Sequence, residues 1–164
     1  MRPIAALAGL VAAAALAGCG FTPMYAQPGV SNAMSHIQVE APKGRIGYLL
    51  GQSLDDAFGH AKGEPPIYRL ELTLTQARQA HGLTANDTAQ RYELDVRATY
   101  NLVVIAGGKV AHTGYAVSNI SYDSTDQPYA GIAARQDVQD RLASDVAQKI
   151  ELQVAAWLST HPPG

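Results

Sequence analysis

The sequence predicts an α+β two-layer sandwich, in which two helices cover one face of a four-stranded mixed or antiparallel sheet. Two segments alternate strictly between apolar and polar residues, which is typical of a sheet with one buried and one hydrated face. Two other segments repeat apolar residues at helical spacing. The order is strand, helix, three strands and helix, and covering the apolar sheet face with both helices is the economical way to bury these surfaces.

The chain begins with a segment typical of a secretory signal, and this segment ends at the only cysteine. Arg2 precedes an apolar run of residues 4–17, which is shorter than the about 20 apolar residues that a spanning helix needs. Small residues then precede Cys19, an arrangement that resembles the bacterial lipobox. In a lipobox the thiol accepts a diacylglyceryl group, the peptide is cut before the cysteine, and the new amine is usually acylated. We therefore expect residues 1–18 to be removed and Cys19 to anchor the chain to a membrane; the alternative is an ordinary secretory signal.

A single domain, residues 36–160, is predicted to follow a lipidated tether of residues 19–35, and residues 161–164 form a tail. The tether is inferred from prolines and glycines among polar residues, a composition that gives flexible linkers. It also contains three apolar side chains, which could pack on lipid headgroups or a partner, or could instead begin the fold. These are Phe21, Met24 and Tyr25.

The domain opens with a short strand and an amphipathic helix. The alternation of His36–Glu40 predicts the strand, which Pro42 closes. Apolar residues then recur at helical spacing from Ile46 to Phe58, with polar residues on the other side. Gly59 or Gly63 is expected to end this helix.

The next three elements are predicted strands. In residues 68–75 every second residue is apolar, and the pattern returns in residues 92–102 with both charge signs on the polar face. Gly107 and Gly108 make a tight hairpin turn. A fourth strand follows at about residues 110–122, but its alternation is too irregular to assign its faces.

The last element is a long helix. Pro128 suits its first position, and Thr125 or Asp126 is available as a cap. Its apolar residues recur every fourth position, so the apolar stripe winds around a helix of 3.6 residues per turn. The stripe comprises Val138, Leu142, Val146, Ile150, Val154 and Leu158, widened by Ala147 and Trp157. His161–Gly164 ends the helix.

Composition excludes some functional classes. The chain has 12 Lys and Arg against 14 Asp and Glu, and Arg2 leaves with the signal, so the mature chain is mildly acidic. Nucleic-acid binders normally show a basic stripe, which this balance disfavours. With a single cysteine, an internal disulfide is impossible, and stability must come from the core.

The sequence gives no pattern typical of catalysis, a cofactor or a metal. Ser53 and Ser121 lack the glycines of a nucleophile elbow, and Asp55 and Asp56 are adjacent, so they point to different parts of the helix surface. The five histidines show neither an i,i+4 pair nor a His-Glu arrangement for zinc. These are His36, His60, His81, His112 and His161. We therefore expect a protein that is not an enzyme.

Four motifs follow one another along the chain. Cys19–Tyr25 has the pattern Cys-Gly-Phe-x-Pro-[Leu/Met]-Tyr, and Arg45–Gly47 at the start of the first long helix has the pattern Arg-x-Gly. Thr88–Arg91, before the third strand, has the pattern Thr-Ala-x-Arg, and Tyr122–Ala130, before the last helix, has the pattern Tyr-Asp-x-x-x-x-Pro-Tyr-Ala. In this order the four motifs resemble those of the LPS-assembly lipoprotein family, the small partner of the LPS-assembly β-barrel.

The resemblance implies a lipoprotein that plugs the lumen of the barrel from the inner leaflet of the outer membrane. It would help the barrel fold and help deliver lipopolysaccharide to the cell surface. Barrel lumens are polar, and the hydrated sheet face could meet one through ion pairs and hydrogen bonds. That face carries Arg69, Glu71, Arg91, Glu93, Asp95 and Arg97. Gly20 after the lipidated cysteine fits an outer-membrane address. The alternative is a generic envelope lipoprotein module with another periplasmic or outer-membrane partner.

The resemblance also implies contact with lipopolysaccharide, whose lipid A phosphates call for Lys or Arg. Three cations near turn ends of the predicted sheet are the candidates: Arg78, Arg91 and Lys109. Their assignment does not come from the family motifs.

Overall fold

The computed structural model describes residues 29–59, 65–83, 89–123 and 127–161. The predicted α+β class and the order of the main elements are confirmed, with one additional short helix at the start. The elements are α2 (Val30–Ser35), β1 (Ile37–Glu40), α3 (Arg45–Phe58), β2 (Tyr68–Leu83), β3 (Ala89–Val104), β4 (Lys109–Asp123) and α4 (Pro128–Thr160). Among the described residues, no helix combines the length and the apolar character needed to cross a membrane.

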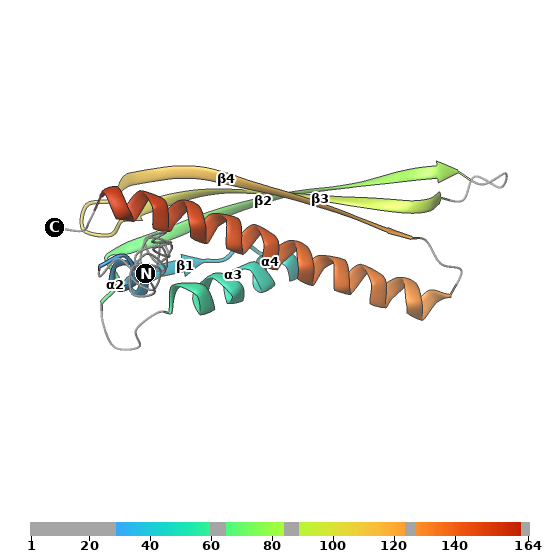
Figure 1. Ribbon diagram of the computed structural model, residues 1–164, viewed down its shortest axis with the longest axis horizontal. Helices are drawn as coiled ribbons and strands as arrows, with labels where there is room; N and C mark the ends of the chain where they lie inside the picture. The colour runs from blue at the N-terminus through green and yellow to red at the C-terminus, as the bar shows by residue number, and fades with distance from the viewer. Residues whose placement is uncertain (1–28, 60–64, 84–88, 124–126, 162–164) are drawn as a thin grey trace, which may run out of the picture.

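The four strands form one mixed sheet in the order β1-β2-β3-β4. β1 is parallel to β2, whereas β2, β3 and β4 are antiparallel neighbours. α3 and α4 lie on the same side of this sheet, and α4 runs along almost its whole length (Figure 1). The result is two layers, with the opposite face of the sheet left free of helices.

The core lies between the sheet and the helices and follows the predicted periodicities. All six residues of the four-residue ridge on α4 are at most 3 % exposed. From the sheet, Leu70, Val96, Ala98 and Leu102 are fully buried against them. β4, whose faces the sequence left unassigned, turns Ala116 and Ser118 inward.

Helix α2 corrects the predicted domain boundary. Residues 30–35 fall in the segment predicted as a tether, yet Val30, Ala33 and Met34 are buried in the core. Their apolar spacing covers too few residues to stand out as a helix in the sequence. The rest of the predicted tether, residues 19–28, lies outside the described residues.

Strand lengths and one cap also differ from expectation. β2 continues to Leu83 and β3 begins at Ala89, so this hairpin is longer than its alternation predicted. Polar residues occupy inward positions there, which hides the strand signal. Gly59 ends α3 in the left-handed conformation, as expected, with φ 61°. Gln127, rather than Thr125 or Asp126, caps α4, without a side-chain hydrogen bond.

Candidate functional site

The face of β2, β3 and β4 that the described helices leave uncovered, here called the outer face, is a surface that the core does not use. Alternation places one set of residues inside and the next set outside, and the antiparallel register aligns the outer set across the strands. Arg97 lies opposite Thr75 on one side and Val117 on the other. The outer face therefore behaves as one flat, mainly polar surface.

Cross-strand pairs occupy the part of the outer face near the β2–β3 loop. In these pairs a carboxylate faces either a side-chain amide or a basic side chain. Each charged group therefore has a neighbour of opposite charge or a hydrogen-bond partner. Gln79 donates to Asp95 at 3.1 Å, Asn119 donates to Glu93 at 2.8 Å, His81 lies 3.2 Å from Glu93, and Arg91 lies 2.9 Å from Asp123. Exposed pairs of this kind contribute little to stability, so their acceptors and donors remain available to a partner.

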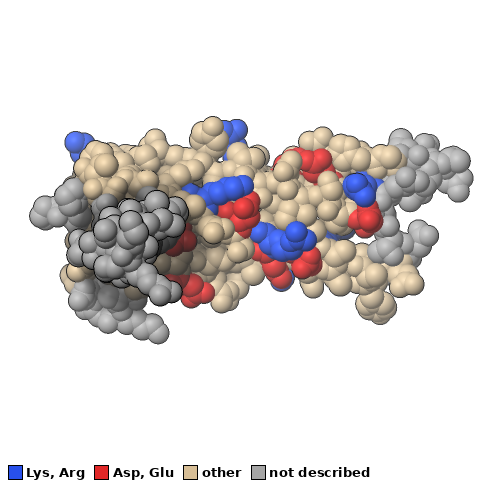
Figure 2. Space-filling view, in the orientation of Figure 1, with Lys and Arg blue, Asp and Glu red and all other residues tan. Residues whose placement is uncertain are grey.

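Arg69 forms a second group near β1. Its guanidinium lies 2.6 Å from Glu71 of the same strand and 3.5 Å from Glu40, and the contact with Glu40 joins β1 to β2 on the outer face. The hydrogen bond to Glu71 is the main reason that the pKa of Arg69 is raised; burial lowers this pKa by less, and Coulombic attraction to Glu71 and Glu40 adds a further increase. On the side of the molecule that Figure 2 shows, cations and carboxylates likewise lie next to one another, with uncharged areas between.

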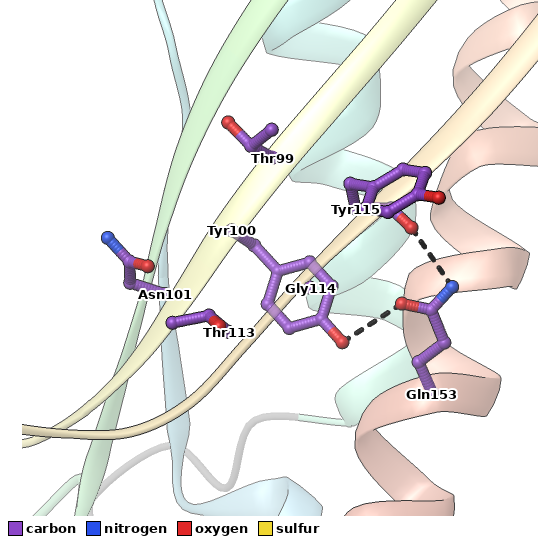
Figure 3. Close-up of a pocket in the computed structure, with 7 residues that line it drawn as sticks. All are labelled: Thr99, Tyr100, Asn101, Thr113, Gly114, Tyr115 and Gln153. Atoms are coloured by element: carbon purple, nitrogen blue, oxygen red, sulfur yellow. Dashed lines mark hydrogen bonds between the residues drawn. The ribbon is translucent and has the colours of Figure 1, made fainter.

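An uncharged hollow of about 750 Å³ lies in the middle of the outer face. It is lined by Thr99, Tyr100, Asn101, Thr113, Gly114, Tyr115 and Gln153 (Figure 3). The Arg97 guanidinium lies 4.4 Å from the centre of the Tyr115 ring, a cation–π contact that holds this exposed ring in place. The hollow therefore offers neutral hydrogen-bonding groups and an aromatic surface.

Gly114 leaves room for the Tyr100 ring. The Tyr100 ring crosses β4 at this glycine to reach Gln153 on α4 (Figure 3). The Tyr100 hydroxyl donates to Gln153 Oε1 at 3.0 Å, and Gln153 Nε2 donates to the Tyr115 carbonyl at 3.1 Å. Burial raises the pKa of Tyr100 to about 12, so its hydroxyl stays protonated as a donor. These contacts give Tyr100 a structural role.

The three cations predicted to bind lipopolysaccharide do not form one site. Arg91 lies on the outer face in its pair with Asp123, whereas Arg78 lies on the inner face with its guanidinium 4.7 Å from the Tyr92 ring centre. Lys109 pairs in register with Val104, at the opposite end of the sheet. A 16-residue strand is about 50 Å long, so the structure separates Lys109 from the other two by most of that length.

The structure also shows contacts that sequence reasoning missed. Tyr92 packs on Tyr122 with ring centres 5.7 Å apart, which extends the stack that begins at Arg78. Arg45, in the Arg-x-Gly motif, forms a 2.9 Å ion pair with Asp140 of α4 and so joins the two helices. Tyr122 in the first contact and Arg45 in the second belong to the motifs that resemble the family. Membership in these motifs was the only feature of the sequence that could have indicated the two contacts.

The described residues do not suggest a metal centre. Within the four described ranges, no three His, Cys, Asp or Glu side chains lie close enough to hold a metal ion. Cys19, the predicted lipidation site, lies outside these ranges.

Comparison with known proteins places these features in context. The profile described as "Lipopolysaccharide-assembly" (LptE) matches residues 34–154. A structure named as that of a lipoprotein from Caulobacter crescentus CB15 is 41 % identical, covers 84 % of this chain and 100 % of its own, and has a TM-score of 0.70. No match was found among curated proteins.

Two further structures show the same fold at low identity. The minor lipoprotein from Acinetobacter baumannii is 18 % identical, covers 77 % of this chain and 91 % of its own, and has a TM-score of 0.55. The rare lipoprotein B from Shewanella oneidensis is 14 % identical, covers 76 % and 95 %, and has a TM-score of 0.56. Both likenesses concern the fold alone.

Proposed function

The chain belongs to the lipopolysaccharide-assembly (LptE) family, and on this premise we propose that it plugs and helps assemble a lipopolysaccharide-translocating β-barrel. The proposed role is non-enzymatic: the protein provides a rigid surface around which the barrel closes and along which lipopolysaccharide is delivered. Its partners are then the barrel, lipopolysaccharide and the outer membrane.

The observation that carries this proposal is the flat, polar outer face. Three antiparallel strands of 15 or 16 residues give a surface about 50 Å long, and a barrel lumen is polar. Glu93 and Arg91 on this face are paired across strands with His81 and Asp123, so these charges can enter a lumen without becoming isolated. The uncharged hollow beside Tyr115 offers a place for a lumen-facing side chain.

The lipid anchor is part of the proposal. We place two or more acyl chains on Cys19, which together give stable membrane attachment. The domain is then held at the periplasmic side of the outer membrane. Intact-mass measurement of the native protein tests this step, because an unmodified thiol would contradict it.

Lipopolysaccharide contact is assigned to the β2–β3 hairpin. Arg78 and Arg91 lie on this hairpin, and phosphates favour Arg for its planar set of donors. Lys109 lies too far away to share a ligand headgroup with them.

Co-purification from gently solubilised outer membrane tests the function. The protein should be recovered in an equimolar complex with a large β-barrel, and its depletion should lower surface lipopolysaccharide and leave the barrel misassembled. Recovery with a different envelope protein would support the generic lipoprotein module instead.

Matched variants test which surface meets the barrel. Thr99→Arg with Thr113→Arg fills the hollow with two charges, whereas Ser144→Arg with Gln148→Arg adds the same charges to exposed positions of α4. We expect the first pair to reduce barrel recovery at least several-fold and the second to leave most of it. Equal recovery of the two would reject the outer face as the contact surface.

A further inference from the structure

The outer face has an aliphatic patch at the end opposite the β2–β3 loop. The patch consists of Ile67, Val103, Ile105 and Val110. Ile67 lies opposite Ile105, since the Ile105 amide donates to the Ile67 carbonyl at 3.0 Å, and Val103 pairs with Val110. The register puts Val103 opposite Arg69, on the outer face, where it is 4 % exposed and outside the core cluster.

Three residues of the patch leave apolar surface in contact with solvent, whereas Val103 is buried. Ile67, Ile105 and Val110 are 39 %, 41 % and 46 % exposed. Next to these residues the outer face carries the Arg69 ion pairs, and further along it carries the cross-strand pairs. The patch is therefore an apolar area on a mainly polar surface. Lys109, an exposed cation, precedes Val110 in β4.

The chain enters the domain beside this patch. The His36 carbonyl, directly after α2, accepts hydrogen bonds from the amides of Ile67 at 2.9 Å and Tyr68 at 3.2 Å. α2, the start of β2 and the β3–β4 turn lie at the same end of the molecule (Figure 1). The connection from Cys19 to Val30 therefore ends close to Ile67.

The length of this connection decides which end of the molecule stays near the bilayer. Ten residues separate Cys19 from Val30, which span at most about 40 Å when extended and average about 18 Å when flexible. The β2–β3 loop lies a further 50 Å or so along the sheet. An anchor at Cys19 thus holds the aliphatic patch, and not the hairpin tip, at the membrane surface.

We propose that the aliphatic patch is a second membrane contact, which rests on the phospholipid surface into which the acyl chains of Cys19 insert. Ile67, Ile105 and Val110 enter the headgroup region. The inference rests on the lipid anchor of the proposed function and adds to it an orientation, because two contacts fix which end of the domain faces the bilayer.

Site-directed spin labelling of the mature lipidated protein tests this contact. The protein is reconstituted in vesicles of phosphatidylethanolamine and phosphatidylglycerol, with a nitroxide at Val110→Cys or, as the matched control, at Ser121→Cys. Both positions are exposed outer-face sites of β4, about 35 Å apart, and acylated Cys19 does not take the label. We expect the ratio of oxygen to nickel-chelate collision rates to be at least threefold higher at position 110. Ile105→Asn should lower that ratio toward the value at position 121.

Each other outcome overturns the inference. Equal ratios at positions 110 and 121 on vesicle-bound protein would leave the anchor and the proposed function intact. If neither oxygen nor the nickel chelate reaches the label at position 110, and this happens only after the barrel is added, the patch contacts the barrel and not the membrane. The same shielding without the barrel would assign it to the chain's own N-terminal segment. Protein that never binds the vesicles would contradict the lipid anchor as well.

Discussion

The Tyr100 side chain of β3 packs against β4 at Gly114, where the absence of a side chain leaves room for the ring. A Cβ atom at Gly114 would lie 2.5 Å from the Tyr100 hydroxyl oxygen and 2.6 Å from Cζ of the same ring. The ring is 2 % exposed and held by its hydrogen bond to Gln153, so it has little room to move. At this position the requirement for glycine is a matter of side-chain volume.

Gly114→Ala should destabilise the protein by about 1–3 kcal/mol, the usual cost of adding a methyl group to packed space. Urea unfolding measures the change. In a Tyr100→Leu background the same substitution should cost much less, because the overlapping ring atoms are gone. Thr113→Ala, on the exposed neighbour, serves as the control and should stay within about 0.5 kcal/mol. A cost at Gly114 that persists without the ring would point to the backbone instead.

Two imidazoles stack on the ring of the only tryptophan. The ring centres of His112 and Trp157 are 5.6 Å apart, and those of Trp157 and His161 are 4.8 Å apart. Burial lowers the pKa of His112 from its ordinary value of 6.5, and Coulombic repulsion from His161 lowers it further. The neutral form of His112 is therefore the one that the fold favours.

This pKa gives stability a dependence on pH with a definite sign. Between the folded pKa of His112 and about 6.5, the unfolded chain binds more protons, so stability is present above 6.5 and is lost as the pH falls. His112→Phe should reduce the drop in unfolding free energy between pH 7.5 and pH 5, measured by urea titration with circular dichroism. His81→Gln, on the outer face away from Trp157, should keep the wild-type drop. An unchanged drop in His112→Phe would mean that other groups cause the acid sensitivity.

At the scale of elements, α4 protects the open edge of the sheet at β4. Lys149 donates to the Val117 carbonyl at 2.8 Å, and Gln153 donates to the Tyr115 carbonyl. One turn earlier, hydrogen bonds from Lys149 and then from Ser118 lower the pKa of Asp145. These three helix positions are four residues apart and so lie in one row along the strand. Occupied carbonyls make the edge a poorer template for pairing with another chain.

Gln153→Leu tests the hydrogen bond that joins α4 to Tyr100 of β3, because it leaves the buried Tyr100 hydroxyl without its partner. We expect a loss of about 1–2 kcal/mol in the free energy of unfolding. In a Tyr100→Phe background the loss should be smaller, and the difference measures the coupling of the two groups. Gln148→Leu, exposed on the same helix, is the control. Strict additivity of the two substitutions would show that the hydrogen bond does not matter.

At the scale of the whole molecule, the two ends of the sheet have different chemistry. One end carries the aliphatic patch and the entry of the N-terminal connection, and the other carries Arg78, Arg91 and the stacked tyrosines. A sheet about 50 Å long keeps the proposed membrane contact and the proposed lipopolysaccharide contact apart. The protein can therefore be anchored at one end and receive a ligand at the other.

This separation predicts unequal effects of removing the three candidate cations. Arg78→Ala with Arg91→Ala should weaken lipopolysaccharide binding by the purified protein about tenfold or more, because each removes a charged hydrogen-bond donor for phosphate. Lys109→Ala should leave that affinity within about twofold. Surface plasmon resonance on immobilised lipopolysaccharide measures both. Equal effects, or none, would remove the hairpin from consideration as the binding site.

Much of the fold was predictable because its signals are local. The alternation in residues 68–75 and 92–102 and the ridge on α4 set which side chains face the core, and Gly59 ends α3 as its backbone freedom allows. Such periods of 2 and 3.6 residues follow from the geometry of a single strand or helix. Lipidation of Cys19 remains a prediction from the same kind of local pattern.

The amino-acid pattern alone was thus enough to predict the class of the fold and the direction of most side chains. Distances between residues far apart in the chain became known only from the folded molecule: Arg78 and Arg91 lie on opposite faces of one hairpin, and Lys109 is far from both. The fold also placed Val103 with Ile67 on the outer face. The reason is physical, because a residue's face depends on its own backbone, whereas its neighbours depend on which strand pairs with which and in what register.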